Sequence, residues 1–404
     1  MTQTWALLVD AYRELNSKRL FWLVLALSLL IVACFACVGI NDRGLTFLIW
    51  DIPISILNTS LMSEALFYRL MFLTLGFSVW LSWAATILAL ISTAGIFPDF
   101  LAGGSIELTL SKPIGRFRLF LTKYMTGLLF VAIQVAAFSA ASFLVIGLRG
   151  KVWDVRMFWA IPLMVAFFSY LYCFSALIAL VTRSTMGAFL TTLLLWCVIF
   201  LVHLAESGII LQFKVRADQI VALQQSELDK TTADLAAARE KLKAEEKPPA
   251  SAGASAEPAP QADVSKTKAA ERVEKLEADA AQWNDRLTSS RADQQKLERI
   301  HAVAFAVKSL LPKTSETVEL LRRAIVQNTE LEAFQDKSSA AAAGVAGVRG
   351  IETVEGVRVS ARATQREMQR VLDSRSVAWV LGTSLAFEAV LLAIGGWVFS
   401  RRDF

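Results

Sequence analysis

The chain contains very little histidine and cysteine for its length. Its 404 residues include two histidines, His203 and His301, which cannot form a metal cluster by themselves. All four cysteines fall in apolar runs: Cys34, Cys37, Cys173 and Cys197. Inside such a run, the C-x-x-C spacing of the first pair is more typical of small packed side chains than of a redox or metal site. We therefore expect no metal centre and no disulfide-stapled domain.

A nucleotide-binding motif is missing as well. No segment matches G-x-x-x-x-G-K-[ST], so the chain cannot hold nucleotide phosphates in a P-loop. The net charge of +5 is not accompanied by the basic and aromatic surface that nucleic-acid binding requires. We expect no catalytic residue, no cofactor bound by this chain and no nucleic-acid partner.

Charge is scarce, and long apolar runs take its place. Hydrophobic residues make up 55% of the chain and charged residues 19%, as in a membrane protein. Six apolar stretches are long enough to cross about 30 Å of hydrocarbon as helices. They cover residues 20–40, 70–96, 119–148, 158–181, 187–207 and 376–399. We predict an all-α membrane protein with five helices in 20–207 and a sixth, followed by a short tail, in 376–404.

Lys and Arg are distributed unevenly among the short loops. They are more frequent in the loops that lie inside if the N-terminus is cytoplasmic than in the outer ones. This bias predicts that both termini are cytoplasmic and that the long segment 208–375 lies outside. Apolar residues recur at helical spacing in 1–19, which indicates an amphipathic helix at the inner interface.

The loop between the second and third apolar stretches carries the most informative motif. Residues 104–124 read GSIELTLSKPIGRFRLFLTKY, with Ser111 able to cap a helix and Pro113 suited to its first turn. This loop resembles that of the ABC-2 type permeases, the membrane subunits of one class of ABC transporters, which typically has a glycine, a short acidic-apolar stretch and L-S-K-P-I-x-R. The matching residues are Gly104, Glu107, Leu110, Ser111, Lys112, Pro113, Ile114 and Arg116.

Shorter matches extend the resemblance. The T-R-S turn at 182–184, the L-L-P-x-T run at 310–314 and the F-x-R-R-D ending at 399–403 are similar to family features. The resemblance covers 1–212 and 310–404 but not the segment between them. It implies a permease that pairs with a second copy or a sister permease in the inner membrane of a prokaryote. It also implies a separate cytoplasmic ATPase subunit that binds ATP and magnesium.

A short segment at the start of the cytoplasmic loop 97–118 has two interpretations. It contains Phe97, Pro98, Asp99, Phe100 and Leu101. Pro98 can start a short helix, which would leave the apolar side chains near water. They either pack back on the second and third membrane helices or dip into the interface, or they insert into a groove on the ATPase. The resemblance implies the second role, because the family's coupling element occupies this loop.

The segment 208–375 differs completely from the membrane helices. Val221, Leu228, Leu235 and Leu242 recur every seven residues, the geometry of a coiled-coil seam. A second helical stripe follows a Pro/Ala-rich link at 247–264, so we predict an antiparallel helical hairpin. The hairpin is either an inserted spacer or a projection that contacts, through 217–311, an envelope protein or a second copy of the chain. A further helix is expected over 352–372.

Glu388 lies deep in the last apolar stretch. Charge at such a depth is expensive and normally faces the bundle interior or water. Glu388 is either a protonated hydrogen-bonding group or a residue that lines a path or gate.

These patterns are compatible with two functions. One is export of a substrate driven by the partner ATPase. The alternative is mechanical: the same motion moves the outer hairpin to control an envelope partner without transport. A scaffold protein that acts without an ATPase would leave the 104–124 motif unexplained. The sequence does not identify a substrate.

Overall fold

The computed structural model describes residues 19–48, 50–53, 59, 62–102, 115–151, 153–246, 260–326, 351–354 and 357–401. The predicted interfacial helix before Arg19 and residues 247–259 of the predicted link lie outside these ranges. The chain forms two compact units. The membrane unit contains Met1–His203, Ala306–Gly347 and Asp373–Phe404, and the second unit contains Leu204–Phe305 and Val348–Leu372.

Among the described residues, six helical segments are long and apolar enough to cross a membrane. They are Arg19–Cys37, Glu64–Leu101, Arg116–Gly150, Val155–Thr182, Thr185–Ala244 and Val377–Arg401. Each predicted apolar stretch coincides with one of them, as expected of a multi-pass helical membrane protein. The helices of the membrane unit are α2 (Arg19–Cys37), α3 (Glu64–Met71), η1 (Phe72–Ala85), α4 (Thr86–Ala94), α5 (Ile96–Ala102), α7 (Arg116–Gly150), η2 (Val155–Trp159), α8 (Ala160–Thr182), α9 (Thr185–His203), α12 (Thr314–Ile325) and α15 (Val377–Arg401).

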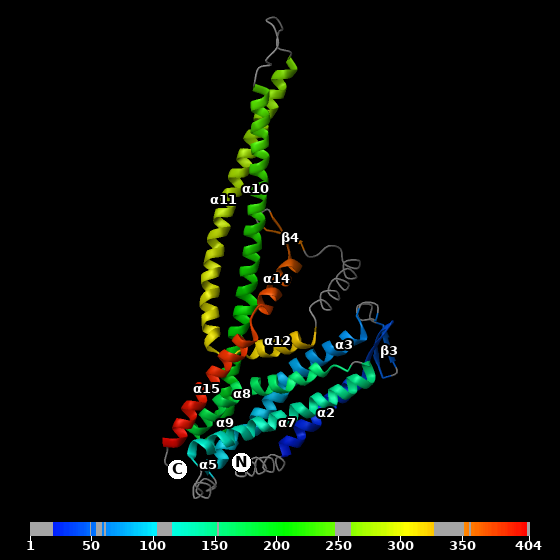
Figure 1. The fold of residues 1–404 in the computed structure, drawn as a ribbon, viewed down its shortest axis with the longest axis vertical. Helices are drawn as coiled ribbons and strands as arrows, with labels where there is room; N and C mark the ends of the chain where they lie inside the picture. Colours follow the sequence, from blue (N-terminus) through cyan, green and yellow to red (C-terminus); the bar gives the residue numbers. More distant parts are fainter. Residues whose placement is uncertain are drawn as a thin grey trace. The chain divides into compact units, whose positions relative to one another are not determined.

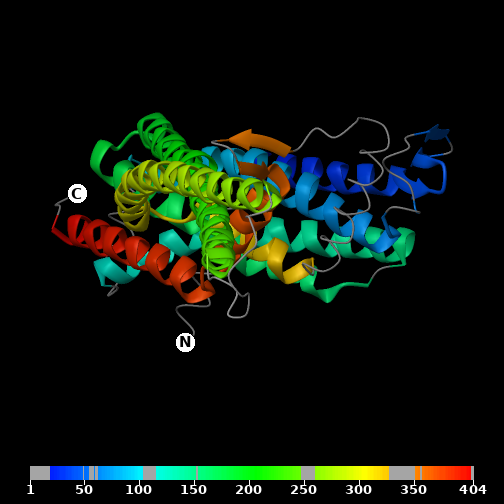
Figure 2. The same ribbon diagram turned by 90° about the horizontal axis from the view of Figure 1, so that it is seen from above.

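Helix α8 forms the centre of the membrane unit. It packs against α7, α9, α12 and α15, while α2 packs along α7. Within this unit α15 lies on the side away from α2 (Figures 1 and 2). Bulky side chains fill the interior, among them the fully buried Phe72, Phe138 and Phe168. Many apolar side chains on the outer helices remain exposed, as lipid contact requires.

A π-helix replaces regular α-helix in the second membrane segment. It covers η1, and Ser82 Oγ and Thr86 Oγ1 donate to carbonyl oxygens five residues earlier, those of Phe77 and Leu81, both at 2.9 Å. Long π-helices are rare, and the wider turn changes which side chains face the bundle. The sequence pattern predicted a helix here but not this type.

The first membrane helix ends earlier than predicted. It stops at Cys37, and a three-stranded antiparallel sheet follows, with strands β1 (Val38–Asn41), β2 (Gly44–Phe47) and β3 (Trp50–Pro53). Asn41 Oδ1 accepts hydrogen bonds from the backbone N–H groups of Arg43 and Gly44 at 3.0 and 2.9 Å, which closes the first turn. Gly44 has φ 143°, a conformation that glycine adopts readily. The prediction that helix continues to residue 40 is therefore wrong.

The second unit is built around two long helices. Helix α10 (Leu211–Glu246) follows η3 (Leu204–Ile210), and α11 (Pro260–Leu310) lies beside α10 (Figure 1). Hydrogen bonds join Arg239 to Glu277 at 2.6 Å and Arg291 to Gln225 at 2.7 Å, so the two helices run antiparallel. The predicted seam residues of α10, which are Val221, Leu228, Leu235 and Leu242, are half-buried, while most neighbouring positions are exposed.

The expected helix over 352–372 is wrong in its first part. Strands β4 (Ile351–Val354) and β5 (Val357–Ser360) form an antiparallel pair, and only then does α14 (Ala361–Asp373) begin. β-Branched residues are frequent in both strands and favour extended backbone over helix. Thr364 of α14 donates a hydrogen bond of 2.7 Å to Gln219 of α10.

Candidate functional site

The aromatic residues expected to couple the chain to an ATPase lie on α5. Phe97 is 1% exposed, and its ring centroid is 5.4 Å from that of Phe120 on α7. Phe100 is 6% exposed, and the ammonium group of Lys123 lies 5.2 Å from its ring centroid. The expectation that these rings remain near water is therefore wrong, and the packing agrees with the alternative in which they turn back on the bundle.

The other residues of the predicted coupling segment differ in exposure. Pro98 is buried and Leu101 is half-buried, whereas Asp99 is exposed and marks the outward side of α5. The helix packs against both α7 and α8. The motif residues Gly104, Glu107, Ser111, Lys112 and Pro113 lie outside the described residues. Arg116, the last residue of the motif, starts α7, and its Nη1 donates to the carbonyl oxygen of Ser400 at 3.2 Å.

The carboxyl group of Glu388 lies in the interior of the membrane unit. Glu388 is 8% exposed and projects from α15 toward α7 and α8. Tyr124 Oη lies 2.8 Å from its Oε1, and Ser169 Oγ lies 2.7 Å from its Oε2. Both oxygens therefore have a hydroxyl partner, one from each neighbouring helix. This geometry agrees with the hydrogen-bonding alternative, and it joins three membrane helices at one point.

Aromatic rings cover this carboxyl site. Tyr124 stacks on Tyr172 with centroids 5.2 Å apart and an interplanar angle of 11°, and Tyr172 stacks in turn on Phe168 at 5.4 Å. Gly127 of α7 faces the ring of Tyr172, and any Cβ at this position would overlap the ring. The absence of a side chain at Gly127 therefore allows the tyrosine stack that holds Tyr124 against Glu388.

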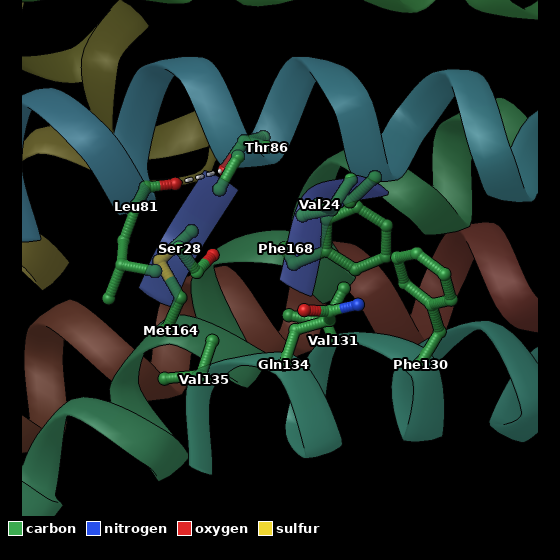
Figure 3. Close-up of a pocket in the computed structure, with 12 residues that line it drawn as sticks. Val24, Ser28, Leu81, Thr86, Phe130, Val131, Gln134, Val135, Met164 and Phe168 are labelled. Atoms are coloured by element: carbon green, nitrogen blue, oxygen red, sulfur yellow. Dashed lines mark hydrogen bonds between the residues drawn. The ribbon is translucent and has the colours of Figure 1, made fainter. Parts of the chain in front are cut away.

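A mostly apolar pocket opens between α2, η1, α4, α7 and α8 (Figure 3). Its empty volume is about 310 Å³, a figure that includes space open to the surroundings. The polar lining residues are Ser28, Thr86 and Gln134. Gln134 Nε2 donates to the carbonyl oxygen of Phe21 at 2.8 Å, whereas its buried Oε1 has no hydrogen-bond partner among the described residues. The pocket thus contains one buried acceptor without a hydrogen-bond partner among the described residues, in apolar surroundings.

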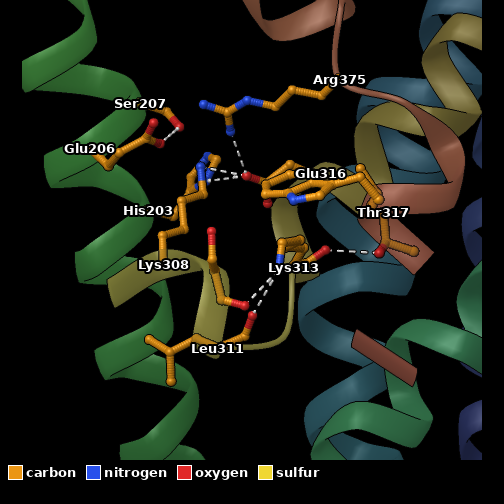
Figure 4. A network of polar contacts seen from close by, with 12 residues as sticks. His203, Glu206, Ser207, Lys308, Leu311, Lys313, Glu316, Thr317 and Arg375 are labelled. Atoms are coloured by element: carbon orange, nitrogen blue, oxygen red, sulfur yellow. Dashed lines mark hydrogen bonds and ion pairs between the residues drawn. The ribbon is translucent and has the colours of Figure 1, made fainter. Parts of the chain in front are cut away.

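A buried ionic cluster surrounds Glu316 at the start of α12 (Figure 4). Glu316 is 5% exposed, and its Oε1 lies 3.0 Å from Arg375 Nη1 and 3.6 Å from His203 Nδ1. The ammonium group of Lys308 forms an ion pair with the same oxygen. Burial alone would raise the pKa of the Glu316 carboxyl, but the interactions with His203 and Lys308 outweigh it and hold that pKa well below its usual range. Glu316 is therefore ionised at neutral pH.

Lys313 lies beside this cluster and is 1% exposed. Its Nζ is 3.2 and 3.4 Å from the carbonyl oxygens of Ser309 and Leu311, and 4.5 Å from the ring centroid of Trp379. Its backbone N–H donates to Ser384 Oγ at 2.9 Å. Burial lowers the pKa of the Lys313 ammonium group to about 8. The residue joins the turn before α12 to α15.

The sequence patterns did not reveal the Glu316 cluster. The charged residues that follow the L-L-P-x-T run are indistinguishable in sequence from those of a solvated helix face. Within the second unit, Glu206 is fully buried, accepts a 2.5 Å hydrogen bond from Ser207 Oγ and lies 3.3 Å from His301.

A metal centre is not evident in the parts of the chain that the structure describes. No three His, Cys, Asp or Glu side chains gather there as ligands, and the four cysteines are free. Comparison with protein-family models, with curated proteins and with solved structures finds no match for this chain. The likeness to the ABC-2 type permeases therefore rests on the sequence motifs alone.

Proposed function

We propose that this chain is the membrane subunit of an ABC-2 type transporter and that a separate cytoplasmic ATPase drives it. The observation that carries the proposal is the sequence motif at 104–116, which follows the second membrane segment in the sequence and ends where the third begins. The chain itself has no P-loop, so the partner must bind and hydrolyse ATP. Two such permeases, identical or sister chains, would form the complete transporter in a prokaryotic inner membrane with their termini in the cytoplasm.

The contacts of α5 support a direct mechanical link between the partner and the bundle. Phe97 and Phe100 are buried, so force applied to the outward side of α5 reaches α7 and α8 through close packing. Asp99 is exposed on that outward side. In this scheme the ATPase contacts Asp99 and the loop that follows, and the two phenylalanines transmit the movement inward.

Substitution of Asp99 tests this contact. Asp99→Arg is expected to leave the amount of membrane-inserted, folded protein unchanged, because the side chain is exposed, and to reduce ATPase co-purification several-fold. Phe100→Asp is expected to lower the amount of folded protein itself, because it buries a charge. The measurement is ATPase recovered per folded permease after affinity purification. Full recovery with Asp99→Arg would remove this residue from the contact.

A mechanical role is the second candidate, and the second unit favours it. Helical structure continues without interruption over Thr185–Ala244, so the fifth membrane helix and α10 form one stretch of helix. Helices α10 and α11 contain 36 and 51 residues, and at about 1.5 Å per residue they are longer than a membrane span requires. In this reading the pair is an extracytoplasmic hairpin through which ATPase-driven movement reaches an envelope partner.

Removal of the long helices separates the two roles. Replacement of 217–300 by a short Gly/Ser linker is expected to preserve membrane insertion and ATPase binding, because this segment belongs to the second compact unit. Transport that persists in the shortened chain would favour export. ATP hydrolysis that persists while the cellular phenotype is lost would favour the mechanical role. Failure of the shortened chain to fold would show that the two units are not independent.

A further inference from the structure

Ionisable residues lie next to three of the points, here called crossings, at which the chain passes between its two units. His203 is the last residue of the first part of the membrane unit, and Lys308 lies just after the chain returns at Ala306. Asp373 is the first residue after the next return, and Arg375 follows it closely. The remaining crossing, near residue 347, lies outside the described residues.

All three described crossings are joined to α12. The carboxylate of Glu316 contacts a residue from each: His203, Lys308 and Arg375. These side chains come from the end of α9, the end of α11 and the short connection between α14 and α15. Figure 4 shows the three converging on Glu316. One carboxylate thus holds three segments that are far apart in the sequence.

The C-terminal half of α12 adds a second set of contacts to the third crossing. Arg323 Nη1 donates to the carbonyl oxygens of Asp373 and Arg375 at 3.1 and 3.0 Å, and its Nε lies 3.0 Å from the Asp373 carboxylate. Arg322 lies 3.4 Å from the same carboxylate. Helix α12 therefore contacts the third crossing through both an acidic side chain, Glu316, and two basic ones, Arg322 and Arg323.

Helix α12 is itself embedded in the membrane unit. Leu320, Leu321 and Ile325 are 6%, 0% and 0% exposed, and the helix packs against η1, α8, α9 and α15. A buried ion pair adds little net stability compared with apolar packing, yet removal of one partner is costly, so such pairs fix geometry more than they add stability. The ion pairs of Glu316 therefore fix the positions of the segments that they join to α12.

We propose that α12 is an anchor helix that holds three segments of the membrane unit together as one group, with Glu316 as the shared contact: the end of α9, the end of α11 and the residues just before α15. A shift of α8 or α15 that carries α12 then moves these three segments together. A bundle without this helix would leave each segment free to move separately.

Hydrogen–deuterium exchange of the purified full-length chain in detergent tests the proposal. Glu316→Gln keeps the size of the side chain and removes its charge. We expect amide exchange to become about tenfold faster or more around residues 203, 308 and 375 together, because three buried cationic or polar partners lose one anion. Exchange in the part of α7 and α8 around Tyr124 and Ser169 should stay as in the unmodified chain.

Glu319→Gln is the matched control, since Glu319 lies on the same helix, is more exposed and pairs with Arg322 rather than with a crossing residue directly. Equal exchange in the two variants would overturn the proposal, as would acceleration at only one crossing. If Glu316→Gln does not yield folded protein, Glu316→Asp decides the matter. The shorter carboxylate should accelerate exchange at all three crossings, and an unchanged pattern would again overturn the anchor role.

Discussion

Alanine in place of Gly127 is expected to destabilise the membrane unit by about 1–3 kcal/mol, because it forces an extra methyl group into a filled interior. A Cβ at this position overlaps the ring of Tyr172, which is fully buried between Tyr124 and Phe168 and cannot move aside cheaply. The displaced ring would also separate Tyr124 from Glu388. The measurement is the thermal unfolding of the purified protein in detergent, followed by the loss of monodisperse protein.

Gly382→Ala provides the comparison for this substitution. Gly382 also lies in a membrane helix, α15, but among the described residues no atom outside its immediate neighbours and the local helix backbone lies within 4 Å of the position that a Cβ would occupy there. The substitution is expected to leave the unfolding temperature unchanged or to raise it slightly, because alanine favours helix over glycine. If both variants unfold at the same temperature, the close contact between Gly127 and Tyr172 does not constrain the bundle.

Leucine in place of Glu388 is expected to cost about 1–3 kcal/mol of stability, because it removes the shared partner of two buried hydroxyl groups. Glu388→Gln keeps two polar atoms that can bond to Tyr124 and Ser169, so its stability should stay close to that of the unmodified chain. The glutamine variant should also keep full activity if the carboxyl group is structural. The measurement is activity per folded protein for both variants, together with their unfolding temperatures.

The same pair of variants distinguishes the two interpretations of Glu388. A glutamine variant that folds normally but loses transport or ATPase stimulation would show that the ionisable group serves a path or gate. Normal stability of Glu388→Leu would show that the contacts to Tyr124 and Ser169 add little. Either result would contradict the structural role that the contacts support.

The membrane helices were predictable because each is a long apolar run, and a bilayer leaves helix as the simplest way to satisfy the backbone. Their ends were less predictable. The end of α2 at Cys37 depends on a turn built around Asn41 and Gly44, which lies beyond the apolar run. Strands β4 and β5 were not predicted, because each is only four residues long and such short runs of β-branched residues carry a weak periodic signal beside a helical stripe.

Of the candidate functional sites, the sequence likewise indicated one and did not reveal another. Glu388 was recognisable because a lone carboxylate in an apolar stretch is conspicuous, although its partners Tyr124 and Ser169 were not. Glu316 was hidden, because acidic residues are common on the exposed face of an amphipathic helix. Only the fold brings His203, Lys308 and Arg375 to it across long stretches of sequence. Burial of Phe97 and Phe100 likewise depends on tertiary packing that local sequence does not encode.

Purification of the affinity-tagged chain from its native membranes in a mild detergent, with an ATPase assay and identification of the co-purifying proteins, tests the central claim most directly. A permease of the proposed type should carry a second polypeptide with a P-loop in near-equal amount, and the complex should hydrolyse ATP. The same chain purified without such a partner, even after cross-linking in the membrane, and without ATP hydrolysis would contradict the assignment.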